Sequence, residues 1–126
     1  SQVADFEVEM KSLPGSKLEL KIKNNTQGNM NITNDRHKID YRSYQKVDYK
    51  NDSNEIIFSD LLSVGGNRLV IIIDGGDTWS YTYQLHSSRF DVSVAKKIHL
   101  TLVLNHAINK RYAQWQTKEF DLTYQK

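Results

Sequence analysis

Apolar and polar side chains alternate with a period of two along most of this 126-residue chain. In DFEVEM, residues 5–10, three apolar side chains share one face and three acidic side chains share the other. In KLELKIK, residues 17–23, an apolar face is opposed by a mainly basic one. Because successive side chains of a strand point to opposite faces, this pattern predicts half-buried antiparallel strands. Pro14–Gly15 between the two segments predicts a tight turn, and therefore a hairpin whose acidic and basic outer faces lie side by side.

Further segments with the same kind of pattern follow this hairpin. Their residue ranges are 30–32, 37–50, 55–58, 68–73, 78–85, 89–95, 97–105 and 118–125. The alternation breaks near Ser43–Tyr44, which predicts a bulge or a strand that changes sheet, and Gly65–Gly66 predicts a corner. The 68–73 segment, RLVIII, is apolar on both faces and predicts a central strand buried on both sides. About seven to nine short strands without a long helix predict one all-β domain over residues 1–126, an antiparallel β-sandwich.

The composition excludes several classes of protein. The formal net charge is +2, and the basic residues form only short clusters at 36–38, 96–97 and 110–111, which argues against nucleic acid binding. No apolar run approaches the roughly 18–20 residues of a membrane span. The chain has no cysteine, so disulfides do not hold this fold, and a domain of this length can bury a stable core without them.

The segment Asp74–Gly75–Gly76–Asp77 joins two predicted strands and has two interpretations. One is a metal or acid–base site built on the two carboxylates. A calcium ion takes about six to eight oxygen ligands, however, and these two aspartates have no acidic companion close by in the sequence. Glycines supply positive φ angles in a hairpin turn, and aspartates bond to the turn backbone. We therefore interpret the segment as a turn.

The histidines give no sign of a catalytic or metal site. His37, His86, His99 and His106 show neither an HExxH motif nor a spacing typical of zinc ligands. The chain also lacks a GxSxG elbow, a P-loop and a GxGxxG fingerprint. The sequence thus predicts a protein that is not an enzyme and has no metal or cofactor. A hydrolase with a dispersed site is a third-ranked alternative, and it predicts a pocket that pairs His99 or His106 with a carboxylate.

Aromatic side chains provide the candidate binding residues. Trp79, Tyr81 and Tyr83 alternate along one segment and are expected in the core. The segment NKRYAQWQTK, residues 109–118, reads as a hairpin loop between the last two strands. The candidate protein- or ligand-binding residues are Trp115, Tyr112, Arg111, Lys110, Asn109 and Tyr44. The competing interpretation is that Trp115 closes the open end of the sandwich.

The order of segments resembles that of small immunoglobulin-like or transthyretin-like sandwiches, many of which are soluble parts of bacterial envelope lipoproteins. The resemblance rests on KLELKIKNNT, a polar loop, FSDLLSVGGNRLVIII and a closing HLTLVLN…QWQTKEFDLTY hairpin. It covers most of the chain as architecture and matches no invariant motif. The outer-membrane lipoprotein of type VI secretion systems is one candidate in this class, although the chain lacks a clear counterpart of that family's Asn–Pro and Ser–Pro loop.

The sandwich pattern and the lack of a catalytic constellation predict a non-enzymatic protein-binding or scaffolding domain that presents loops or an exposed strand edge to another protein. The resemblance implies that this partner belongs to an envelope or surface assembly. It also implies an extracytoplasmic location, at the periplasmic face of the outer membrane or outside the cell, and a membrane tether through an N-terminal anchor before Ser1. The alternative is a carbohydrate- or membrane-lipid-recognising module, including a small pore-forming type, that uses the same aromatics.

Overall fold

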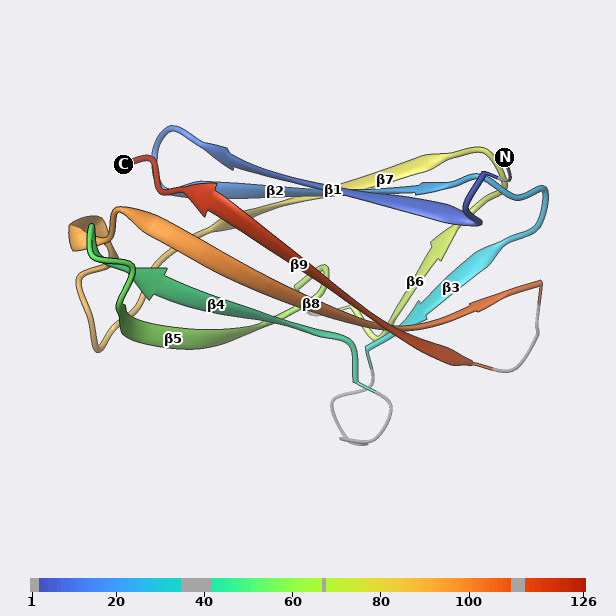
Figure 1. The fold of residues 1–126 in the computed structure, drawn as a ribbon. Coiled ribbons are helices and arrows are strands. Elements are labelled where there is room, and N and C mark those ends of the chain that lie inside the picture. The colour runs from blue at the N-terminus through green and yellow to red at the C-terminus, as the bar shows by residue number, and fades with distance from the viewer. Residues whose placement is uncertain (1–2, 35–41, 67, 110–112) are drawn as a thin grey trace.

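The structure is a computed structural model, which describes residues 3–34, 42–66, 68–109 and 113–126. The described residues form nine strands in two antiparallel sheets, and the sequence prediction of an all-β antiparallel fold is confirmed (Figure 1). The strands are β1 (Phe6–Leu13), β2 (Lys17–Asn24), β3 (Met30–Thr33), β4 (Tyr44–Lys50), β5 (Ile56–Ser63), β6 (Val70–Ile73), β7 (Thr78–Gln84), β8 (Lys97–Ile108) and β9 (Gln114–Thr123). The smaller sheet has the order β1-β2-β7, and the other six strands form the larger sheet.

The predicted first hairpin is confirmed, including its charge pattern. β1 and β2 pair so that Glu7 faces Lys23, Glu9 faces Lys21 and the charge order reverses at the next outward pair. Lys21 Nζ also lies 3.7 Å from an oxygen of Glu19 along its own strand. Opposite charges across a strand pair stabilise this register. The apolar pattern fixes it as well, because a slip of one residue would turn the apolar face toward solvent.

The 12-residue strand β8 is the spine of the larger sheet. β9 pairs with one side of it over residues 97–106. β4 and β3 follow one another along its other side, since His106 pairs with Ile32 of β3 and with Gln114 of β9 at the same time. β5 then pairs with β4, and β6 pairs with β3.

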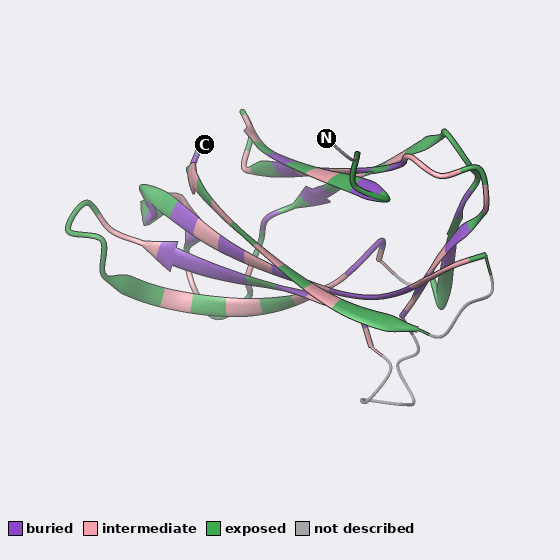
Figure 2. Ribbon diagram, turned by 45° about the vertical axis from the view of Figure 1, so that its right-hand side comes forward, coloured by how far each residue is buried: buried purple, intermediate pink, exposed green. Residues whose placement is uncertain are grey.

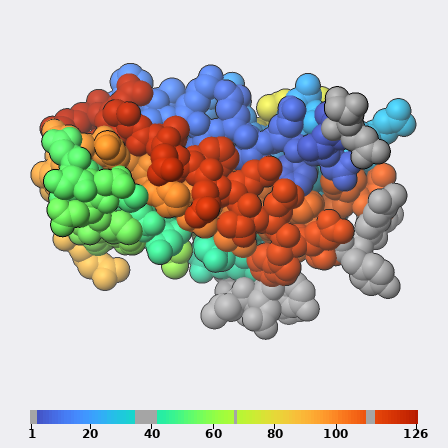
Figure 3. Space-filling view, viewed as in Figure 1, coloured from blue at the N-terminus to red at the C-terminus, as the bar shows by residue number. Residues whose placement is uncertain are grey.

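The core lies between the two sheets, where the apolar faces of β1, β2 and β7 meet those of the larger sheet. The apolar side chains with no exposed area are Leu18, Leu20, Ile22, Met30, Ile32, Val47, Val64, Leu100, Leu102 and Leu104. Figure 2 shows that β4 is mostly buried and that β8 alternates between buried and intermediate residues along most of its length, whereas β5 has exposed and intermediate residues and none that are buried. On one flank β1 lies against β9 (Figure 3), so the sheets approach each other there.

The Asp74–Asp77 segment is a turn, as the sequence predicts. The Asp77 N–H donates to the Asp74 carbonyl oxygen at 3.0 Å, and Gly76 has a φ of 81°. Gly75 is required for a second reason, because a Cβ there would lie 2.6 Å from the backbone of Gln27. The turn is also held by Asn24, whose carbonyl oxygen accepts from the Gly76 N–H at 2.9 Å.

Two strand predictions are wrong. The 68–73 segment was expected to be a central strand, but β6 pairs only with β3 within the described chain, and its residues Val70 and Ile72 are exposed. The 89–95 segment forms a short 3₁₀ turn at Val92–Val94, because the Asp91 side chain accepts from the Ser93 N–H and caps the turn.

Candidate functional site

One long edge of the larger sheet is formed by β5 and β6. These strands flank β4 and β3, which lie on the same side of β8, and neither has a second strand neighbour among the described residues. They therefore form one broken edge, which we call the β5–β6 edge (residues 56–63 and 69–73). A strand edge with unpaired backbone is a surface to which another chain can pair, unless the protein blocks it.

Large apolar side chains are concentrated on the β5–β6 edge. They are Ile56, Ile57 and Leu61 of β5, Leu69 just before β6, and Val70 and Ile72 within it. Leu61 and Ile72 expose 60% and 62% of their full area. The described part of the chain has nine exposed large apolar side chains, so this edge holds six of the nine. Scattered single exposed apolar residues are normal, but a concentration on one element indicates an interaction surface.

A buried asparagine holds the corner between β5 and β6. Asn34 Nδ2 donates to the carbonyl oxygens of Val64 at 2.9 Å and Arg68 at 3.2 Å. The backbone N–H of Asn34 donates to the Leu69 carbonyl oxygen at 2.7 Å. Since Asn34 is fully buried, these bonds fix the chain between the two strands in one position.

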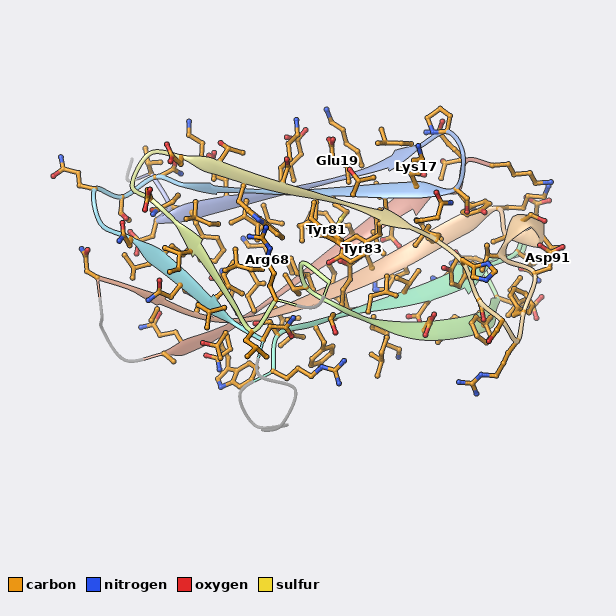
Figure 4. All side chains as sticks on the ribbon, turned by 180° about the vertical axis from the view of Figure 1, so that it is seen from behind. Lys17, Glu19, Arg68, Tyr81, Tyr83 and Asp91 are labelled. Carbon is orange, nitrogen blue, oxygen red and sulfur yellow. The ribbon has the colours of Figure 1, made fainter. Side chains whose placement is uncertain are left out.

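Tyr83 of β7 ties the same corner to the smaller sheet. Its hydroxyl donates to the Ser63 carbonyl oxygen at 3.2 Å and accepts from the Gly65 N–H at 3.3 Å. Burial raises the pKa of Tyr83, so the hydroxyl keeps its proton and its role as a donor. Figure 4 shows Tyr81 and Tyr83 extending from β7 toward the larger sheet. The corner between β5 and β6 is therefore fixed by hydrogen bonds from both sheets.

Asp60 blocks part of the backbone of this edge. Its Oδ1 accepts from the N–H of the next residue, Leu61, at 2.9 Å. That donor is consequently occupied and is not offered to an added strand. On the neighbouring strand, Lys46 faces Leu61 and Lys50 faces Ile56. The apolar side chains thus remain exposed while a carboxylate covers one backbone donor.

The aromatic candidates from the sequence lie elsewhere. Trp115 was placed in a loop, but it is the second residue of β9, paired with Asn105. It is 51% exposed, so the interpretation that it closes the end of a sandwich is also wrong. Tyr44 is not in a loop either: it begins β4 and pairs with Val103. By strand alternation Trp115 and Tyr44 share the outer face of the larger sheet, on opposite sides of β8.

Asn109 lies just after β8 and is exposed, with a φ of 57°. Its N–H donates to the Asn29 carbonyl oxygen at 3.0 Å, and its side chain packs so closely on Gly28 that a Cβ there would overlap it. Asn109 is therefore held against the loop at residues 28–29 and does not form a binding surface together with Trp115. The other three candidates, Lys110, Arg111 and Tyr112, lie outside the described residues.

The structure pairs His99 with carboxylates, as the hydrolase alternative required. His99 Nδ1 lies 2.7 Å from Asp121 Oδ1, and Nε2 lies 3.4 Å from Glu119 Oε1. The hydrogen bond to Asp121 raises the pKa of His99, which favours the imidazolium. Both ring nitrogens thus face carboxylates, and no described hydroxyl is hydrogen-bonded to the ring. Ser59 on the same face donates instead to Asp48, at 2.6 Å. This geometry lacks the nucleophile and free base nitrogen of a hydrolase.

His106 lines a pocket of about 270 Å³ together with Asp5, Thr26, Asn109 and Gln114. Burial lowers the pKa of His106, and its ring packs edge-on against Phe6 at 4.8 Å between centroids. Although His106 and Asp5 share this pocket, no hydrogen bond joins them. Among the described residues, no group of three or more His, Cys, Asp or Glu is placed to hold a metal ion.

The β5–β6 edge is absent from the sites predicted from sequence, although the sequence carries a signal for it. Residues 69–73, LVIII, are apolar at successive positions, so whichever face of this strand lacks a covering layer must expose apolar side chains. Periodicity shows that both faces are apolar, but it does not show which strand lies at an edge.

The comparisons with known proteins show similarity at the level of the fold. No family model matches the sequence, and no curated protein matches it. No helix in the described segments is long and apolar enough to cross a membrane. Among solved structures, the chain is similar to the crystal structure of a Bordetella pertussis protein provisionally named ApaA, with a TM-score of 0.56 and 12% sequence identity. The similarity covers 95% of this chain and 94% of that one. At this identity it shows a shared fold alone.

Proposed function

We propose that this domain binds another protein through its β5–β6 edge and does not catalyse a reaction. The observation that carries the proposal is the concentration of six of the nine exposed large apolar side chains on that edge. Burying apolar area of this kind is the main favourable contribution to association between proteins. The charged outer face of the smaller sheet, by contrast, offers no comparable apolar surface.

The mode of binding follows from what the edge leaves open. Asp60 occupies the Leu61 N–H, so a partner that added a full strand would first have to displace that carboxylate. Leu61 and Ile72 need no such displacement, because their side chains are already exposed on a braced framework. The partner therefore makes its principal contacts with these side chains, as the buried anchors of an interface.

The finer fold type and the location are part of this proposal. The two facing antiparallel sheets support a β-sandwich of the immunoglobulin-like or transthyretin-like kind. A role as a scaffolding domain of the cell envelope or extracellular space, in a secretion or surface assembly and tethered by an N-terminal anchor, rests on the sequence resemblance. Fractionation of the source cells tests this location, and recovery of the full-length protein in the cytoplasm would contradict it.

A second candidate function is recognition of carbohydrate or membrane lipid, and the exposed ring of Trp115 favours it. It predicts binding in glycan-array or liposome assays that Trp115→Ala abolishes. Failure to bind in both assays would remove this candidate.

Site-specific photo-crosslinking in the source cells tests the principal proposal. Benzoylphenylalanine replaces Leu61 or Ile72 on the edge, and Thr117, exposed on β9, serves as the matched control. We expect one discrete heterologous adduct from positions 61 and 72 and none from position 117. The same adduct should be lost when Leu61→Lys is combined with the probe at position 72. An adduct of twice the chain mass, or crosslinks from position 117 alone, would overturn the proposal.

A further inference from the structure

Two lysines face each other directly on the outer face of the larger sheet. Lys50, the last residue of β4, pairs with Lys97, the first residue of β8. Like charges opposite each other in a sheet are destabilising. Neither lysine has a carboxylate within ion-pair distance of 4.0 Å among the described residues, since the ion pairs found there involve other groups. An arrangement that opposes folding stability indicates a use for the two charges.

Both lysines line one pocket of about 460 Å³ at this end of the sheet. The other polar groups in its wall are the side chains of Asn54, His99, Asp121 and Thr123. Thr123 stands opposite Lys97 on β9, so the hydroxyl and the two ammonium groups come from three adjacent strands. Ammonium, amide and hydroxyl groups are all hydrogen-bond donors, which an anionic oxygen ligand requires.

The one carboxylate in the wall is already engaged. Asp121 Oδ1 lies 2.7 Å from His99 Nδ1, and this hydrogen bond lowers the pKa of Asp121 while it raises that of His99. The charge of Lys50 also lowers the pKa of Asp121, so this carboxylate offsets part of the positive charge in the pocket. Lys50 and Lys97 together still supply more positive charge than the single carboxylate removes. Glu119 lies on the far side of the His99 ring, 3.4 Å from Nε2, and is outside the pocket wall.

We propose that this pocket binds an oxyanion, a phosphate or sulfate group, either free or as the ester of a small molecule. Lys50 and Lys97 contact the anionic oxygens, and Asn54 and Thr123 donate to the oxygens that remain. A bound oxyanion converts the repulsion between the lysines into two favourable contacts, which is why it binds here and not at lysines already paired with glutamates. This inference is independent of the protein-binding proposal, because it concerns a different site.

Titration followed by ¹H–¹⁵N NMR tests the inference at constant ionic strength, with chloride as the replaced anion. The probes are inorganic phosphate, inorganic sulfate and glucose 6-phosphate, and glucose is the uncharged control. We expect saturable shifts of the amide signals of Lys97, His99, Asn54 and Thr123. Tighter binding of glucose 6-phosphate than of phosphate would assign the ligand as an ester, and equal affinity would assign it as the free anion.

Matched variants make the result specific to the pocket. Lys50→Gln and Lys97→Gln should each weaken binding about tenfold or more, because each removes a charge-assisted hydrogen bond. Lys21→Gln removes a lysine of the smaller sheet that is paired with Glu19, and it should leave binding unchanged. An unaltered NMR spectrum of each unliganded variant outside the substituted strand shows that the fold is kept. Absence of saturable binding, or equal binding by Lys97→Gln and the parent, would overturn the inference.

Discussion

The outer faces of the two sheets differ in whether lysines that lie opposite another strand have a carboxylate partner. On the smaller sheet, each lysine of β2 that faces outward stands opposite a glutamate of β1, as in Glu9 and Lys21, apart from the lysine at the hairpin turn. On the larger sheet, Lys50 faces Lys97, and the edge beyond β4 exposes leucine and isoleucine. The first face pairs its outward charges. The second face also holds ion pairs, of Lys46 with Asp48 and of His99 with its two carboxylates, but it leaves Lys50, Lys97 and the apolar side chains of its edge without such partners within the described residues. The difference teaches that a face with internal partners serves folding, whereas a face without them is available to other molecules.

The two sheets differ on their outer faces but share a feature of the interior. A buried asparagine at the end of a strand holds part of each sheet in place. Asn24 ends β2, and its amide donates to the carbonyl oxygens of Gly28 and Ile73 while it accepts from the backbone and hydroxyl of Thr26. Asn34 follows β3 and makes two side-chain bonds, both to the corner between β5 and β6. The anchor of the smaller sheet is thus the more completely bonded of the two.

Alanine at these anchors gives the largest expected effect. Asn24→Ala should lower the free energy of unfolding by about 2–4 kcal/mol, and Asn34→Ala by about 1–3 kcal/mol, because each leaves buried backbone groups unpaired. Urea denaturation followed by circular dichroism measures both. Asn25→Ala, which removes one exposed bond to the Ala4 carbonyl oxygen, is the control and should cost under about 1 kcal/mol. A cost for Asn24→Ala no greater than that of the control would show that the buried amide does not hold this end of the fold.

The first hairpin of the smaller sheet could be predicted from sequence almost residue by residue, whereas the pairing of β7 with β2 and the order of the larger sheet could not. The first hairpin combines clean alternation, opposite charges and a Pro-Gly turn within one short segment, so local chemistry is sufficient. The 68–73 segment has no such local signal for its neighbours. Its apolar residues are compatible with a central strand, and tertiary pairing places it at an edge instead. In the 89–95 segment, Asp91 caps a turn and the cap prevails over alternation.

The candidate sites depend on contacts between distant segments, which periodicity does not reveal. Lys50 and Lys97 are far apart in the chain, and only the register between β4 and β8 brings them face to face. Trp115 illustrates the converse, because the sequence marks it as a candidate binding aromatic but leaves its exposure open and gives the wrong element. Alternation therefore predicts which side chains share a face of one strand, and the structure is needed to say which strands are neighbours.

Two histidines of β8 should respond to pH in opposite directions. His99 lies on the outer face, and its hydrogen bond to Asp121 raises its pKa above the ordinary 6.5. The contribution of His99 to the free energy of unfolding is present in full when the pH is below the ordinary pKa of 6.5. It is lost as the pH rises through the raised pKa of the folded state. His106 lies on the inner face, where burial lowers its pKa despite the charge of Asp5. Its contribution is lost as the pH falls from about 6.5 through the lowered pKa.

Unfolding free energies measured by urea from about pH 5 to about pH 8.5 separate the two histidines. The stability difference between the parent and His99→Gln should shrink as the pH rises above neutral. The difference between the parent and His106→Gln should shrink as the pH falls below about 6. Parallel pH profiles for the two variants would contradict the assignment of His99 to an ion pair and His106 to a buried neutral state.

The smallest expected effect is the sharpest test of the comparison between the faces, because it predicts a change of sign. Lys21→Gln removes an attraction to Glu19 and Glu9 and should lower the free energy of unfolding by about 0.2–0.5 kcal/mol. Lys97→Gln removes a repulsion from Lys50 and should raise it by a similar amount, about 0.2–0.5 kcal/mol, when no oxyanion is present. Denaturation in chloride at low ionic strength measures both changes, and salt should diminish both, since these charges are at least partly exposed to solvent. If Lys97→Gln destabilised the domain as Lys21→Gln does, the protein itself would supply a favourable partner for Lys97. The distinction between outward lysines that have a carboxylate partner and the unpaired lysines of the larger sheet would then no longer hold.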